Sequence, residues 1–266
     1  MRRILATVLF VPIFYLLVAY LPPVAFFGLV TVAALLAVGE FYRLFSSDGP
    51  WPLGMAIGCT ATVLLLCSAQ WPTLVSDRAV LLLTALIAAC LPLASHLDLR
   101  RALMQSGMLV TGVLYVGLTL SCLLLTRALP EGEFLIFFVV LITWAGDTGA
   151  YLAGKMFGRH PLAPIVSPKK TIEGLAGGLL LALGLALVSR FWFLPSFSIT
   201  DCIILGLLLT VVGVLGDLVE SAMKRSVAAK DSGALIPGHG GMLDRLDSLL
   251  FTAPCFYYYV SLVKGA

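Results

Sequence analysis

The amino-acid sequence predicts an all-α fold, a polytopic integral membrane helix bundle with about nine transmembrane helices. Three observations support this fold class. Hydrophobic residues make up 60% of the chain and charged residues only 12%, with a mean hydropathy of +1.05, which excludes an ordinary soluble domain. Apolar runs of membrane-spanning length recur along all 266 residues. We expect these runs to be helices, because open strands cannot satisfy their backbone hydrogen bonds in lipid.

The chain contains nine apolar segments, separated by charged or by Pro- and Gly-containing breaks. They cover residues 4–20, 24–42, 52–70, 78–95, 107–126, 133–154, 172–194, 201–222 and 247–263. Pro22 and Pro23 form a tight break, so the first two segments are expected to form a hairpin. Composition changes sharply nowhere. We therefore predict one membrane domain, with a plainer front half in 1–130 and a charged rear half in 131–266.

Basic residues near the ends of the segments predict the orientation of the chain in the membrane. If the chain starts in the cytoplasm, 13 of its 17 Lys and Arg residues fall on the cytoplasmic side. These are Arg2, Arg3, Arg43, Arg100, Arg101, Lys155, Arg159, Lys169, Lys170, Lys224, Arg225, Lys230 and Arg245. We therefore expect a multi-pass protein of the cell inner (cytoplasmic) membrane, with the loops near Arg159 and Lys230 facing the cytoplasm.

Other features of the sequence narrow the function classes. A net charge of +3 without an extended basic patch argues against nucleic acid as a partner. The six cysteines lie singly in or beside apolar runs, so neither a zinc site nor a disulfide framework is expected. In the front half, Glu40, Arg43 and His96 lie near segment ends, where we expect them to anchor helices at the membrane interface.

The stretch from Gly213 to Asp247 interrupts the apolar composition with charge. Residues at i, i+3, i+4, i+7 and i+8 of this stretch are Asp217, Glu220, Ser221, Lys224 and Arg225. In a helix these five side chains share one face. On this face the carboxylates would lie deeper in the membrane than the basic groups. A cation site would then lie below a phosphate-binding site. A structural ion-pair ladder is the alternative, although charges at membrane depth are costly and usually functional.

The next loop, residues 230–241, is rich in glycine around His239. Its backbone amides could approach phosphate oxygens closely, and Lys230 adds positive charge, so the loop is a candidate anion cradle. A solvent-exposed loop without a ligand is the alternative. After this loop, Asp244 and Asp247 stand at i and i+3, again on one helical face.

A second charged region lies between residues 144 and 174. Asp147, Tyr151 and Lys155 stand at i, i+4 and i+8. Asp147 is expected to face the interior beside Asp217, and a structural pair with Lys155 or Tyr151 is the alternative. Small residues that predict close helix packing in this region are Gly149, Gly154, Gly174 and Gly178.

The loop after residue 158 leads to a predicted helix start. Ser167 and Pro168 are predicted to be the N-cap and the first residue of the new helix. A helix N-terminus flanked by Lys169 and Lys170 would bind phosphate, and anionic lipid head groups are the alternative ligand. Glu173 would favour the helix dipole, order a lysine or bind a metal.

These residues carry a resemblance to a known family. From Ser221 to Asp247 the chain resembles the phosphatidate cytidylyltransferase (CDP-diglyceride synthase) signature. The matching residues are Ser221, Met223, Lys224, Arg225, Lys230, Asp231, Gly233, Ile236, Pro237, His239, Gly240, Gly241, Met242, Asp244, Arg245, Leu246 and Asp247. Upstream residues that extend the resemblance are Trp144, Asp147, Tyr151, Gly154, Ser167, Pro168, Lys170, Thr171, Glu173 and Gly174.

The resemblance implies a bacterial-type membrane enzyme of phospholipid biosynthesis. It would transfer a cytidylyl group from CTP to phosphatidic acid, forming CDP-diacylglycerol and pyrophosphate. Its partners would be CTP, phosphatidic acid and membrane lipid, and it would act as a homodimer. Residues 1–130 would be supporting transmembrane helices with candidate dimer contacts, and residues 131–266 would be the catalytic region. Mg²⁺ is the expected cofactor, because carboxylates and substrate phosphates are its usual ligands, with a monovalent cation such as K⁺ as a further candidate. The Gly- and Pro-broken loops would form a polar cavity that faces the cytoplasm.

Site residues are carried over by their matching positions. Asp217 and Asp244 would be the metal ligands, with Asp147 and Asp247 in support. The expected catalytic residues are Asp147, Lys170, Asp217, Lys224, Arg225, Lys230, Asp244, Arg245 and Asp247. The expected substrate-binding residues are Ser167, Lys169, Thr171, Glu173, Ser221, Asp231, His239, Gly240 and Gly241.

Two other function classes share some of these features. A CTP-dependent lipid kinase would use similar groups but would release CDP, whereas the cytidylyltransferase releases pyrophosphate. A secondary transporter would also carry intramembrane carboxylates and helices broken by glycine. The sequence offers only a weak internal parallel for a transporter, between Gly146-Asp147 and Gly216-Asp217.

Overall fold

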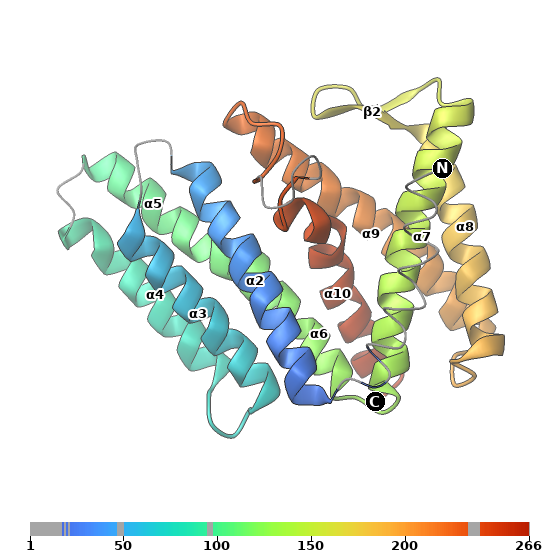
Figure 1. Cartoon of the computed structure of the whole chain (residues 1–266), viewed down its shortest axis with the longest axis horizontal. Helices are drawn as coiled ribbons and strands as arrows, with labels where there is room; N and C mark the ends of the chain where they lie inside the picture. The colour runs from blue at the N-terminus through green and yellow to red at the C-terminus, as the bar shows by residue number, and fades with distance from the viewer. Residues whose placement is uncertain are drawn as a thin grey trace. The chain divides into compact units, whose positions relative to one another are not determined.

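The computed structural model describes Val18, Tyr20 and residues 22–46, 51–94, 98–233 and 240–265 of the chain, which are helical over most of their length (Figure 1). The α-helices are α2 (Pro23–Phe45), α3 (Pro52–Gln70), α4 (Asp77–Ala94), α5 (Leu99–Gly112), α6 (Thr119–Arg127), α7 (Gly132–Phe157), α8 (Ile172–Trp192), α9 (Ile199–Ser226) and α10 (Leu243–Val263). A π-helical turn, η1 (Val113–Leu118), joins α5 to α6 without a break. Two short strands are β1 (Pro161–Ala163) and β2 (Ser167–Thr171).

The prediction of an all-α, multi-pass membrane fold is confirmed. Seven helices among the described residues are long and apolar enough to cross a membrane, with α5, η1 and α6 counted as one span, Leu99–Arg127. The predicted segment 78–95 is α4, which is helical but is not one of the seven. The predicted segment 4–20 lies almost wholly outside the described residues. The number of nine spans therefore stays a prediction.

The chain divides into two compact units, which are described separately. The first unit comprises residues 1–26, 126–222 and 247–266, and the second comprises 27–125 and 223–246. The boundaries near 222 and 247 fall inside α9 and α10. The functional division into 1–130 and 131–266 stays a prediction.

In the first unit, α7 and α8 lie side by side, and the β1–β2 hairpin joins them at one end (Figure 1). Glycines permit this close approach. A Cβ at Gly149 would lie 2.6 Å from the Gly177 carbonyl oxygen, and a Cβ at Gly178 would lie 2.7 Å from the Gly146 carbonyl oxygen. Such distances are too short for any larger residue, so the predicted small-residue contact between these helices is confirmed.

The predicted helix start at Ser167 and Pro168 is wrong. Residues 167–171 form strand β2, which pairs with β1 so that Pro161 lies opposite Thr171. Helix α8 starts at Ile172, and the Thr171 hydroxyl accepts a hydrogen bond of 3.1 Å from the Gly174 amide. Ser and Thr both cap helices well. Backbone pairing with β1 keeps residues 167–171 extended, so Thr171 takes the capping position.

In the second unit, α2, α3, α4 and α5 run beside one another (Figure 1). Tyr42 fixes the spacing of three of them. Its side chain is buried, and its hydroxyl donates a hydrogen bond of 2.9 Å to the Leu109 carbonyl oxygen. Its ring fills the space that a side chain at Gly58 or Gly112 would occupy. The ring therefore holds α2 against α3 and α5.

Candidate active site

The first unit brings three helices together through small residues. A Cβ at Gly216 of α9 would lie 2.5 Å from the Asp247 carbonyl oxygen of α10. The Thr143 hydroxyl of α7 donates a hydrogen bond of 3.0 Å to the Thr252 hydroxyl of α10. Since Asp217 follows Gly216 directly, the close contact between α9 and α10 places Asp217 and Asp247 next to each other.

Three carboxylates converge at this contact. Asp217, Glu220 and Asp247 each offer one oxygen, and these oxygens all lie within 4.8 Å of one another. The Glu220 side chain is only 1% exposed, and the other two are partly buried. At this separation two ionised carboxylates repel each other by about 3 kcal/mol at an effective dielectric constant of about 20. Cationic charge, from side chains or from a bound ion, would relieve that repulsion.

Lys170 supplies positive charge to this cluster. Its Nζ lies 2.7 Å from Asp217 Oδ2, and both side chains are partly buried. The other carboxylate oxygen, Asp217 Oδ1, accepts a hydrogen bond of 3.3 Å from the Ser221 hydroxyl. Lys170 lies in strand β2, so the hairpin carries a basic group to the acidic face of α9. The structure thus brings together Lys170, Asp217 and Asp247, three predicted site residues that are far apart in the sequence.

Asp147 of α7 belongs to the same neighbourhood. It accepts a hydrogen bond from the Ser248 side chain, and it lies within electrostatic range of both Asp217 and Lys170. This agrees with the expectation that Asp147 lies beside Asp217. Lys155 Nζ lies 6.0 Å from the centroid of the Tyr151 ring.

Glu173 joins two segments at the base of the hairpin. Its carboxylate accepts hydrogen bonds from the backbone amides of Arg159 and His160, at 3.0 and 3.2 Å, and contacts His160 Nδ1. Glu173 lies in the first turn of α8, and its carboxylate holds the residues that precede β1. Of the other predicted residues in β2, Lys169 is exposed, Ser167 is partly buried and Thr171 caps α8.

In the second unit, Asp244 organises the ends of the glycine-rich loop. Its Oδ2 accepts hydrogen bonds from the Ser232 amide at 3.0 Å, the Ser232 hydroxyl at 2.9 Å and the Gly241 amide at 2.7 Å. Its Oδ1 lies 2.5 Å from Lys224 Nζ. Gly240 has a φ of +77°, which glycine adopts without strain. Protein donors therefore contact both oxygens of Asp244, and its role as a metal ligand stays a prediction.

The other predicted residues of this loop lie at the surface or outside the described residues. Arg225 is exposed and donates a hydrogen bond of 3.1 Å to the Ala229 carbonyl oxygen. Lys230, Asp231 and Arg245 are exposed. His239 lies outside the described residues. The phosphate-binding roles of this group stay predictions.

Sequence reasoning missed the importance of two acidic residues. Glu220 shares the helical face of Asp217, yet the expected site left it out, although the structure places it among the converging carboxylates. Glu40 was expected to be an interface anchor, and this is wrong, since its side chain is 5% exposed and hydrogen-bonded. The available signal in both cases was a carboxylate inside or beside an apolar segment, where an ionisable group is costly.

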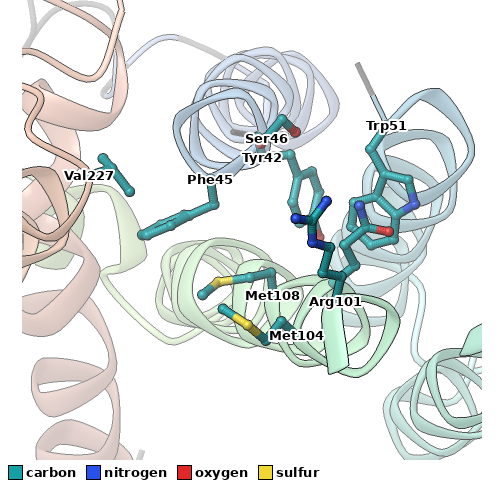
Figure 2. A pocket seen from close by; sticks show the side chains of 9 residues that line it. Tyr42, Phe45, Ser46, Trp51, Arg101, Met104, Met108 and Val227 are labelled. Carbon is teal, nitrogen blue, oxygen red and sulfur yellow. Dashed lines mark hydrogen bonds between the residues drawn. The ribbon is translucent and has the colours of Figure 1, made fainter. Parts of the chain in front are cut away.

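The second unit also contains a cavity of about 150 Å³ (Figure 2). Its lining residues are Tyr42, Phe45, Ser46, Trp51, Arg101, Met104, Gln105, Met108 and Val227. Aromatic and thioether side chains dominate the lining, and Arg101 is its one charged residue. None of the predicted site residues lines this cavity.

Comparisons with known proteins agree with the sequence resemblance. A family model described as the cytidylyltransferase family matches residues 1–263. The phosphatidate cytidylyltransferase of Staphylococcus saprophyticus is 41% identical over 175 residues, which are 65% of this chain and 66% of the relative. The phosphatidate cytidylyltransferase of Staphylococcus aureus (strain COL) is 38% identical over 201 residues, 75% of each chain. The protein of the same name from Bacillus subtilis (strain 168) is 40% identical over 159 residues, 59% of each chain.

The match of the family model over nearly the whole chain agrees with the signature from Ser221 to Asp247. The chain therefore belongs to the cytidylyltransferase family, and its predicted resemblance to the bacterial phosphatidate cytidylyltransferases is confirmed.

Proposed function

We propose that this multi-pass membrane protein transfers the cytidylyl group of CTP to phosphatidic acid, with release of pyrophosphate. The family and the names of its relatives support this reaction. The observation that carries it in the structure is the convergence of Asp217, Glu220 and Asp247 beside Lys170. Acidic groups on membrane-spanning helices, held beside a basic group of strand β2, suit a substrate that is part lipid and part polyphosphate.

The converging carboxylates fit the expected Mg²⁺. They offer only hard oxygen donors, which is the ligand type that Mg²⁺ prefers. We propose Asp217, Glu220 and Asp247 as the residues that would hold the ion, with Asp147 close by. When bound, Mg²⁺ would supply positive charge that balances the phosphate oxygens in the transition state. The resemblance implies Asp244 as the second main Mg²⁺ ligand, in place of Asp247. Substitution of each residue, with the Mg²⁺ dependence of activity as the readout, distinguishes the two assignments. A monovalent cation such as K⁺ is retained as a proposal from the resemblance.

The side chains of this protein would act mainly by positioning and by balancing charge. Lys170 already contacts Asp217, so it can turn toward a phosphate oxygen of CTP with little rearrangement. The Ser221 hydroxyl, on the other oxygen of Asp217, would hold that carboxylate in place. Phosphatidic acid is already anionic and attacks the α-phosphorus directly, so the reaction requires no general base. The protein itself forms no covalent bond with the substrates in such a transfer.

The glycine-rich loop is proposed to bind the nucleotide. Lys224, Arg225, Lys230 and Arg245 are proposed to bind phosphate groups, with Asp231, His239, Gly240 and Gly241 as further substrate contacts. Asp244 fixes the loop ends through Ser232 and Gly241, which would hold backbone amides in position. We also propose an inner-membrane location, loops that face the cytoplasm and a homodimer.

Formation of the lipid product tests the proposal. Purified protein in detergent micelles should convert CTP and phosphatidic acid to CDP-diacylglycerol, and EDTA should abolish the conversion. Mass spectrometry of the extracted lipid identifies the product. Folded protein that forms no CDP-diacylglycerol with Mg²⁺ present would refute the proposed function. Transport of a solute into proteoliposomes without nucleotide would instead favour the transporter, which neither the family nor the relatives support.

A further inference from the structure

Glu40 is a buried carboxylate in residues 1–130, where the sequence predicts no catalytic or substrate-binding residue. It lies in α2, and its side chain is 5% exposed. Its Oε2 accepts a hydrogen bond of 2.9 Å from the Leu243 amide and one of 3.2 Å from the Ser232 hydroxyl. Buried carboxylates are costly unless donors surround them, so these two bonds account for its position.

The two donors flank the central residues of the glycine-rich loop. Ser232 precedes the undescribed residues 234–239, and Leu243 follows them at the start of α10. One carboxylate therefore joins the two ends of this loop. The contact with Leu243 links residues 203 positions apart in the chain.

Two glycines of the loop lie against the same carboxylate. A Cβ at Gly233 would lie 2.8 Å from Glu40 Oε1 and 2.9 Å from its Cδ, and the nearest atoms to that Cβ all belong to Glu40. A Cβ at Gly241 would overlap Glu40 Oε2 and the Ser232 hydroxyl. The loop backbone thus packs directly on Glu40, and this contact explains why both positions require glycine.

Glu40 and Asp244 share the hydrogen bond of one hydroxyl group, that of Ser232. The Ser232 hydroxyl lies 3.2 Å from Glu40 Oε2 and 2.9 Å from Asp244 Oδ2, and a hydroxyl has a single proton to donate. Lys224 lies on the far oxygen of Asp244 and offsets charge there. Helix α2 thereby becomes part of the same hydrogen-bond network as the family signature.

We propose that Glu40 is a positioning residue for the reaction, because it holds the two ends of the nucleotide-binding loop together. The inference deepens the proposed function and rests on it, since the loop carries the expected phosphate-binding groups Lys230, Gly240 and Gly241. Glu40 acts through the loop backbone and does not itself contact CTP. Loss of Glu40 leaves Asp244 as the remaining carboxylate that holds the loop ends, so they become less ordered and CTP then binds more weakly.

The first experiment compares Glu40→Ala, Glu40→Gln and an unrelated acidic substitution, Asp77→Ala. Asp77 is an exposed residue at the start of α4 in the same unit, so it is a matched control. Glutamine keeps an oxygen that can accept both bonds, because a single oxygen, Oε2, accepts them in the wild type. Hydrogen exchange of peptides that span residues 240–246 reports on the loop without any need for activity.

We expect Glu40→Ala to speed amide exchange in these peptides by about tenfold or more, because hydrogen bonds to charged groups contribute strongly to local stability. The KM for CTP should rise by a similar factor, while the KM for phosphatidic acid changes little. Asp77→Ala should match the wild type in exchange and in both KM values, and Glu40→Gln should show a much smaller change than Glu40→Ala, because glutamine keeps the acceptor oxygen but loses the charge. This selective effect on CTP would not arise from general destabilisation.

Gly233→Ala keeps the proposal testable if Glu40→Ala fails to fold, because it leaves Glu40 in place; the double variant adds a check where Glu40→Ala folds. Gly233→Ala in the wild-type background forces the new methyl group against the Glu40 carboxylate and should raise exchange and the KM for CTP. In the Glu40→Gln background the same clash persists, whereas in a Glu40→Ala background the methyl group has room. Gly233→Ala should therefore add no further defect to Glu40→Ala.

Two results would overturn the proposal. One is wild-type exchange of residues 240–246 in Glu40→Ala. The other is faster exchange with an unchanged KM for CTP, because the loop ends would then not matter for the nucleotide. Failure of the proposed function would look different, since the wild type would form no CDP-diacylglycerol while the exchange results stayed as expected.

Discussion

The contact between α9 and α10 at Gly216 offers a sharp test of the acidic site. Substitution by alanine places a Cβ 2.5 Å from the Asp247 carbonyl oxygen, whereas ordinary van der Waals contact begins at about 3.4 Å. The atom that it meets is backbone, so no side chain can rotate away. The two helices must separate locally by roughly 0.9 Å, and overpacking of this kind costs about 1 to 3 kcal/mol.

This separation moves Asp247 relative to Asp217 and Glu220. A displacement near 1 Å in a site that aligns reactants typically lowers the rate by about 100-fold. We therefore expect Gly216→Ala to lower kcat/KM by about 100-fold and to raise the Mg²⁺ concentration needed for half-maximal activity. The matched control is Gly184→Ala, a helical glycine in α8 of the same unit with no heavy atom within 4 Å of its added Cβ.

The assay is formation of CDP-diacylglycerol across a Mg²⁺ titration, together with the thermal stability of each variant in detergent. Gly184→Ala should keep wild-type activity and be as stable or slightly more stable, because alanine favours the helix over glycine by about 1 kcal/mol. Wild-type activity and Mg²⁺ dependence in a folded Gly216→Ala variant would refute the argument that this helix contact sets the geometry of the acids.

Further predictions concern single residues. Asp217→Asn and Asp247→Asn should each nearly abolish turnover while the protein stays folded, as judged by thermal unfolding, since an amide keeps the shape but removes the ligand charge; substantial turnover in either would remove that residue from the site. Lys170→Gln should raise the KM for CTP by about tenfold, because one charge-assisted phosphate contact is lost; an unchanged KM would leave Lys170 with a structural role. Thr171→Ala should lower the free energy of unfolding by about 1 kcal/mol through loss of the α8 cap, measured by thermal unfolding; no change would argue against the cap. A single cysteine reporter at Lys230, in a cysteine-free background, should resist an impermeant reagent added outside intact cells; labelling from outside would reverse the proposed orientation.

The helices could be predicted from the sequence because their cause is local. Each predicted segment that falls within the described residues has a helix there, and the last segment, 247–263, starts only a few residues after α10 begins at Leu243. The apolar length that spans lipid is a property of consecutive residues, so hydropathy is sufficient to find it. The close contact of Gly174 and Gly178 with α7 was also predictable, because small residues let two helices approach each other.

The parts that failed depend on distant partners. Ser167 and Thr171 are equally good caps by composition, and only the pairing of residues 167–171 with β1 decides between them. Glu40 resembles an interface residue until its bond to Leu243, 203 positions away, is seen. Within the site, the spacing of Asp244 and Asp247 placed both on one face, but it could not show that loop donors contact Asp244 while Asp247 joins Asp217 and Glu220.

The fate of the three phosphates of CTP tests the central claim most directly. Purified wild-type protein is incubated with Mg²⁺, phosphatidic acid and CTP that carries ³²P at either the α or the γ position, and the lipid and aqueous products are separated. Cytidylyl transfer predicts that the α label enters the lipid while the γ label leaves as pyrophosphate, with both signals lost in Asp217→Asn. Recovery of the γ label in the lipid and of CDP in the aqueous phase would contradict the account, because that outcome is the signature of a lipid kinase.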